Sequence, residues 1–151
     1  MNGFVTSSLP KPFDAMRAER RLAELDGEGL DLPPDARAVL DAAFGNSPFL
    51  CRLALRERGM LPGLFARGLQ DAVLAAHTQA LNAANAPDQS TAMSDLRQAK
   101  RRAALAIALA DIAGVWTVDE VTRALSEFAD ACVKGALRFL LRQAAERAGT
   151  A

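Results

Sequence analysis

One long amphipathic pattern near the end of the chain constrains the fold most. Across residues 117–148, apolar residues recur at about 100° per residue, the period of an α-helix, and charged residues occupy the opposite side. The apolar stripe contains Val121, Leu125, Phe128, Cys132 and Phe139, flanked by Val118, Ala129, Ala136 and Leu140. A helix of this length with one apolar face needs other elements to cover that face, so the chain must build a helical assembly.

The start of this helix carries its own signal. Thr117 is followed three residues later by Glu120, the spacing of a capping box, in which each side chain bonds the other residue's backbone N–H. Trp116 before the cap and Val121 within the first turn match a hydrophobic staple. We therefore assign Thr117 and Glu120 a structural role.

Prolines and glycines divide the rest of the chain into further helices. Expected helices cover residues 14–25, 34–44, 47–59, 62–67, 69–84 and 91–113. No segment shows the sustained alternation typical of a strand. We predict an all-α multi-helix bundle of about six to seven helices, with two long helices at the C-terminal end. The expected single domain comprises an extended lead-in (1–12), short helices (13–84), a polar linker (85–90) and the two long helices (91–148).

Composition excludes several classes of function. The 18 Lys and Arg residues balance 18 Asp and Glu residues, whereas a nucleic-acid-binding domain carries a basic excess. One His and two widely separated Cys residues cannot form a four-ligand Cys/His zinc site. The most apolar stretch, residues 103–116, is shorter than the ~20 residues of a membrane span, and the start of the chain lacks the pattern of a signal peptide. We expect a cytoplasmic protein that binds neither nucleic acid nor membrane.

The densest charge cluster lies in the first of the two long helices. Arg97, Lys100 and Arg101 share one helical face, whereas Arg102 points away from it. The cluster is either a solvated helix face or a contact for an anion or an acidic partner. The same helix has a strip of alanines and a strip of larger aliphatic residues, which indicates that it lies between two other helices.

Two polar residues, Asp111 and His77, lie apart from this charge cluster. Asp111 is the only charge in the otherwise apolar segment 103–116, so we expect it to be buried and paired with an Arg or Lys of a neighbouring helix. His77 lies mid-helix with no second His or Cys nearby. A metalloenzyme centred on Asp111 and His77 is a minor alternative. We predict no catalytic, metal-ligating or cofactor-binding residue, and we expect Cys51 and Cys132 to be small buried hydrophobes.

Two segments resemble a known family. The run Gly45-Asn46-Ser47-Pro48-Phe49-Leu50 followed by Arg52-Leu53, and a longer block over residues 96–131, are similar to the glutamine synthetase adenylyltransferases in order and spacing. The block contains the segments LRQAKRR, IALADIAG and VTRALSEFADA.

This resemblance implies a large bifunctional enzyme. Such enzymes attach AMP from ATP to glutamine synthetase and remove it by phosphorolysis, with Mg²⁺ as cofactor and a PII signalling protein as regulator. The family's nucleotidyltransferase domains carry a Ser-Asp-x-Asp metal motif, which does not occur before Ala151. We therefore expect an inactive N-terminal helical part that supports or orients the adjoining catalytic domain. The alternative is a stand-alone helical protein-interaction module.

Overall fold

The computed structural model describes residues 9–149, and all regular secondary structure within that range is helical. The seven α-helices and two 3₁₀ turns of these residues are α1 (Ala15–Gly27), α2 (Pro34–Asn46), α3 (Pro48–Arg56), η1 (Arg58–Met60), α4 (Leu61–Arg67), α5 (Leu69–Asn82), η2 (Ala83–Asn85), α6 (Gln89–Ile112) and α7 (Val118–Gly149). The described residues contain no strand, so the all-α prediction with two long C-terminal helices is confirmed.

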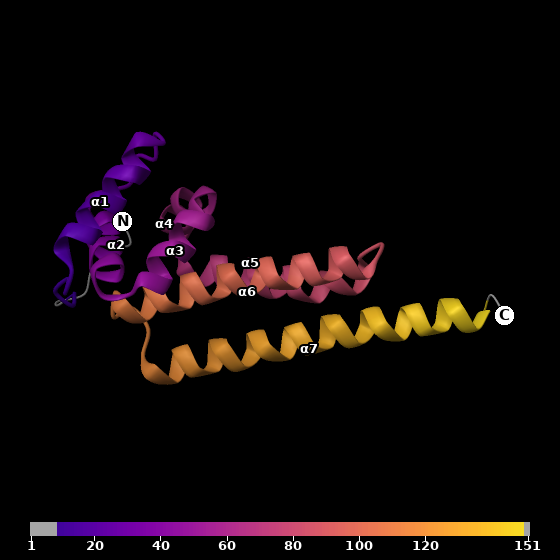
Figure 1. The fold of residues 1–151 in the computed structure, drawn as a ribbon. Coiled ribbons are helices and arrows are strands. Elements are labelled where there is room, and N and C mark those ends of the chain that lie inside the picture. Colours follow the sequence, from indigo (N-terminus) through magenta and orange to yellow (C-terminus); the bar gives the residue numbers. More distant parts are fainter. Residues whose placement is uncertain (1–8, 150–151) are drawn as a thin grey trace.

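The helices form two groups that share α6. Helices α1 to α4 gather around one end of α6, whereas α5 lies along α6 as the other arm of a hairpin closed by η2 (Figure 1). Helix α7 starts beside the first group, runs along the hairpin and extends beyond its turn (Figure 1). The structure thus confirms that α6 lies between other helices.

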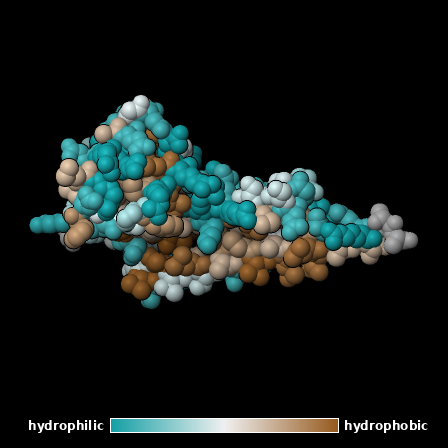
Figure 2. Space-filling view, viewed as in Figure 1, coloured by the Kyte–Doolittle hydropathy of each residue, from teal (hydrophilic) through white to brown (hydrophobic). Residues whose placement is uncertain are grey.

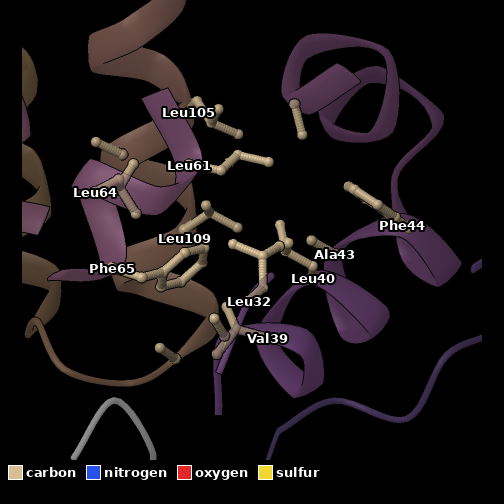
Figure 3. Packing of buried hydrophobic residues seen from close by; sticks show 14 of the residues in the cluster. Leu32, Val39, Leu40, Ala43, Phe44, Leu61, Leu64, Phe65, Leu105 and Leu109 are labelled. Atoms are coloured by element: carbon tan, nitrogen blue, oxygen red, sulfur yellow. The ribbon is translucent and has the colours of Figure 1, made fainter. Parts of the chain in front are cut away.

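The first group surrounds a core of large side chains, which we call the first core. Side chains from α2, α4 and α6 meet in its centre (Figure 3). Its fully buried large members include Leu40, Phe44, Leu61, Leu64, Leu105 and Leu109. These aliphatic and aromatic groups fix α1 to α4 on one side of α6.

The helices α5, α6 and α7 meet instead through small residues, and we call this cluster the alanine core. Its buried members are Ala76, Ala80, Ala99, Ala103, Ile107, Phe128 and Ala131. Gly135 of α7 is buried against α5, and a Cβ atom built on it would lie 2.0 Å from the carbonyl oxygen of Ala80. The backbones of α5 and α7 therefore approach each other more closely than any larger residue permits.

Further along α7, a separate contact holds the helix to the hairpin turn. Phe139 is buried with Ala86 and Ala92, and the guanidinium of Arg142 stacks 5.4 Å from the centre of its ring. Arg142 also donates from Nε to the carbonyl oxygen of Ala84 at 3.1 Å. This contact combines a cation–π interaction with a hydrogen bond to otherwise open backbone.

The apolar stripe predicted for α7 is wider than its buried face. Phe128 and Phe139 are buried, but Val118, Leu125, Ala129 and Leu140 of the same predicted stripe are exposed. The close packing at Gly135 leaves only a narrow contact, because small residues bring the helix axes together without covering its flanks. The sequence pattern identifies every apolar residue of α7, but it does not show which of them another helix covers.

Helix boundaries differ from the expected ones mainly around the hairpin turn. The polar linker expected at 85–90 is reduced to residues 86–88, because η2 continues α5 and α6 begins at Gln89. Asp88 sets this start, accepting a hydrogen bond from the Thr91 N–H at 2.7 Å. Of the predicted extended lead-in, residues 9–12 have no regular structure and residues 1–8 lie outside the described range. No helix in residues 9–149 combines the length and apolarity needed to cross a bilayer.

Candidate functional site

The basic cluster of α6 is partly used inside the molecule. Arg101 Nε lies 2.5 Å from Glu57 Oε1, and Arg102 Nε lies 3.2 Å from Glu57 Oε2. Arg102 therefore reaches the same carboxylate as Arg101, and the prediction that it points away from Arg101 is wrong. Arg97 and Lys100 are exposed, and no ion pair is recorded for either among the described residues. A partner contact by these two residues stays a prediction.

Glu57 is a structural residue that sequence reasoning missed. Its side chain is only 6% exposed and binds two arginines of α6, while its backbone N–H donates to the Leu53 carbonyl oxygen at the end of α3. Arg102 also contacts Gln79 of α5 at 3.4 Å, and Gln79 donates to Gln98 at 2.7 Å. The carboxylate thus joins α3, α5 and α6 in one polar network. Nothing in the sequence marks Glu57, since a glutamate at a helix end is ordinarily exposed.

The expectation for Asp111 is wrong. Its side chain is exposed, and it has no recorded ion pair within residues 9–149. Asp111 follows the half-buried Ala104 and Ala108 on one side of α6, and the two alanines made this side look apolar in the sequence. Since alanine is tolerated at the surface, an apolar run built from it does not show burial on all sides.

The predicted helix start at Thr117 is confirmed. The Thr117 N–H donates to Glu120 Oε2 at 2.7 Å, and the Glu120 N–H donates to Thr117 Oγ1 at 3.3 Å. The first of these bonds lowers the pKa of the Glu120 carboxyl below its usual value. Trp116 and Val121 both pack against the alanine core, and a direct staple contact between them stays a prediction. Gly114, at φ +64°, ends α6 in the left-handed conformation that glycine favours.

One hollow of the surface lies between α5 and the first half of α7. Its volume is about 370 Å³, and its lining includes Leu74 and His77 from α5 and Trp116, Arg123 and Glu127. One imidazole beside a few exposed charges has no activated nucleophile and no second histidine, so it matches no catalytic arrangement. His77 therefore carries no functional assignment.

Within the described part of the chain we find no cluster of side chains that would hold a metal ion and no activated thiol. No three His, Cys, Asp or Glu side chains converge there closely enough to hold an ion. Cys51 is buried and Cys132 half-buried, and burial raises the pKa of both thiols. A raised pKa reduces the thiolate fraction, so both sulfurs behave as apolar groups, as expected for Cys51 and in part for Cys132.

The segment around Gly45 shows what the family-like residues do. A Cβ on Gly45 would lie 2.3 Å from the Cβ of Pro12, so only glycine lets the lead-in cross α2. Asn46 accepts from the Phe13 N–H at 3.1 Å and donates to the Lys11 carbonyl at 3.0 Å. Ser47 accepts from the Leu50 N–H at 3.2 Å and so caps α3. Each of these residues positions backbone, and none forms part of a reactive arrangement.

Comparisons with known proteins agree with the family resemblance of the run that starts at Gly45 and of the block over residues 96–131. The family model described as glutamate-ammonia ligase adenylyltransferase matches residues 38–151. The chain belongs to this family. The match covers α2 to α7 apart from the first residues of α2, so it includes the alanine core and most of the first core, but not the residues that α1 contributes to the first core.

Several curated relatives of this chain are much longer proteins. The bifunctional glutamine synthetase adenylyltransferase/adenylyl-removing enzyme of Caulobacter vibrioides is 35% identical over 90% of this chain and 14% of its own length. The enzymes of the same name from Rhodopseudomonas palustris strain HaA2 and Mesorhizobium japonicum are 40% and 37% identical over 78% and 88% of this chain. The chain spans 12% to 15% of the length of these three relatives. No solved structure matches the chain.

Proposed function

We propose that this chain is a non-catalytic helical scaffold of a bifunctional glutamine synthetase adenylyltransferase and adenylyl-removing enzyme. It supports and orients the nucleotidyltransferase domain that adjoins it and forms a folding unit of its own. The observation that carries the proposal is the use of family-like residues as packing and capping groups. Gly45, Asn46 and Ser47 fix the lead-in and α3, and Arg101 and Arg102 fix Glu57.

The reaction itself belongs to the rest of such an enzyme. No three His, Cys, Asp or Glu side chains converge within residues 9–149 to hold Mg²⁺, and we propose that ATP and Mg²⁺ bind elsewhere in such an enzyme. Glutamine synthetase, named in the relatives' own descriptions, is the proposed protein substrate of the whole enzyme. A PII protein is its proposed regulator, and the cytoplasm is its proposed compartment. None of these assignments places a reacting group in this chain.

A domain exchange tests the scaffold role. The matching stretch of the Caulobacter vibrioides enzyme is replaced by this chain, and transfer of AMP to glutamine synthetase and its removal are both measured. We expect the exchanged enzyme to keep both activities, and the isolated chain to have neither. Turnover by the isolated chain contradicts the proposal.

A matched pair of variants shows whether the fold of the scaffold matters. In the exchanged enzyme, Gly135→Leu blocks the approach of α7 to α5 and should lower one or both activities at least tenfold. Gly149→Ala is the control, because nothing lies within 4 Å of the added Cβ. Full activity of the Gly135→Leu enzyme shows that catalysis does not depend on this segment and rejects the scaffold role.

A further inference from the structure

The outer face of α7 carries an exposed apolar row. Leu125, Val133, Leu137 and Leu141 are 50%, 66%, 53% and 60% exposed, and with Ala129 they follow one another four residues apart. Residues four apart form a continuous ridge on a helix, the element that packs into the groove of another helix. Figure 2 shows hydrophobic surface along the side of α7 that points away from α5 and α6.

A row of charged residues lies beside this apolar row on α7, and the sign of its charges changes at the midpoint of the apolar row. Glu127 and Asp130 precede the midpoint of the apolar row, and Lys134 and Arg138 follow it, all with exposed side chains. The i,i+4 contact between Asp130 and Lys134 is long, at 4.0 Å, and both side chains are open to solvent. These charges are therefore accessible to a second helix.

The two rows are self-complementary about Val133. Rotating α7 by a two-fold axis at Val133 brings Leu125 to the level of Leu141 along the helix, and Ala129 to the level of Leu137. The same rotation places Glu127 near Arg138 and Asp130 near Lys134. In an antiparallel helix pair the charged flank of one helix lies beside the charged flank of the other, so acidic groups meet basic groups on both sides of the axis. A parallel pair would not bring these charges together, because opposite flanks of the two helices then face each other.

We propose that two copies of this chain associate through this face, with their α7 helices antiparallel and crossing at Val133. The interface is isologous, so the same patch serves both copies. A single helix pair buries less surface than a standard protein interface, so the dimer is reversible and concentration-dependent. This proposal does not rest on the scaffold role, because it is argued from the exposed face of α7 and not from the packing and capping contacts of Gly45, Asn46, Ser47 and Glu57.

Sedimentation equilibrium of the purified chain tests the association. We expect a mass approaching twice 16.0 kDa at high micromolar concentration and dissociation on dilution. Val133→Lys places two like charges on the axis and should weaken association at least tenfold, with an unchanged far-ultraviolet helix signal. Leu74→Lys is the control, since Leu74 is 63% exposed on α5 and lies outside the row. A monomer at every concentration, open-ended oligomers, or a dimer unaffected by Val133→Lys overturns the proposal.

Orientation is tested by disulfide trapping in a Cys132→Ala background. A mixture of Leu125→Cys and Leu141→Cys chains should form the mixed cross-link, and each variant alone should cross-link far less. Self-cross-linking of each variant indicates parallel helices and contradicts the proposal. Lys134→Asp should weaken association, and adding Asp130→Lys to it should restore the dimer. Failure of the double variant to recover shows that these charges do not meet across the axis.

Discussion

The first core and the alanine core hold helices together by opposite means. Around the first core, large side chains such as Phe44, Leu64 and Leu109 fill the space between helices that lie well apart. In the alanine core, Ala80, Ala131 and similar residues leave little side chain, and the backbones themselves come into contact. Helix α6 serves both, with Leu105 and Leu109 facing one core and Ala99 and Ala103 the other.

This difference determines which substitutions each core tolerates. A core of large side chains loses contacts when an atom is removed, because neighbours close only part of the cavity. A core of small residues loses its geometry when an atom is added, because backbone cannot move aside as a side chain does. The alanine core also covers less of each helix, which explains why α7 keeps an exposed apolar row.

The largest effect is expected in the first core. Phe44→Ala removes a fully buried ring and should lower the free energy of unfolding by about 3–5 kcal/mol, measured by urea denaturation. Phe49→Ala, at a ring that is 57% exposed on α3, is the control and should change it by less than about 0.5 kcal/mol. Equal decreases in the free energy of unfolding for the two variants show that the stability of the first core does not depend on how completely its interior is filled.

The alanine core should respond to an added methyl group. Gly135→Ala forces a Cβ toward the Ala80 carbonyl oxygen and should destabilise the protein by about 1–3 kcal/mol in the same assay. The sign is informative, because alanine otherwise favours a helix interior over glycine by about 1 kcal/mol. Gly149→Ala, with open space around it, should be neutral. A stabilised Gly135→Ala protein contradicts the close contact of α5 and α7.

The polar network between the two cores should have an intermediate effect. Glu57→Gln leaves Arg101 and Arg102 without their carboxylate and should cost about 2 kcal/mol. Glu28→Gln removes a comparable glutamate–arginine pair, with Arg58, at the surface, where such pairs contribute about 0–1 kcal/mol. Similar decreases in the free energy of unfolding for the two variants show that burial of Glu57 adds nothing to the stability of the contact between the two cores.

The helices could be predicted from the sequence because their signals are local. Ser47 and Pro48, the capping box at Thr117, and Gly114 each act within a few residues, and the structure bears out each of these helix ends. Burial depends instead on which helices meet. The exposure of Asp111 and the burial of Glu57 follow from the placement of α3 and α6, which no local pattern contains.

A smaller effect is expected at the start of α7, outside both cores. Thr117→Ala removes the hydroxyl that accepts from the Glu120 N–H and should cost about 1 kcal/mol. That corresponds to a fall of roughly 2–4 °C in the thermal midpoint of a protein of this size, measurable by calorimetry. Thr117→Ser keeps the hydroxyl and is the control. A loss as large as that of Gly135→Ala indicates that the position of α7 depends on its cap more than on the alanine core.

The smallest effect is a pH dependence at the same cap. Hydrogen bonding lowers the pKa of Glu120 in the folded state, so the unfolded chain binds this proton more readily. The contribution of Glu120 is therefore complete above the usual glutamate pKa of about 4.3 and is lost as the pH falls below it. We expect the thermal midpoint of wild type to exceed that of Glu120→Gln at pH 7, and the difference to shrink toward pH 3. A difference that stays constant with pH shows that ionisation of Glu120 does not supply its contribution to stability.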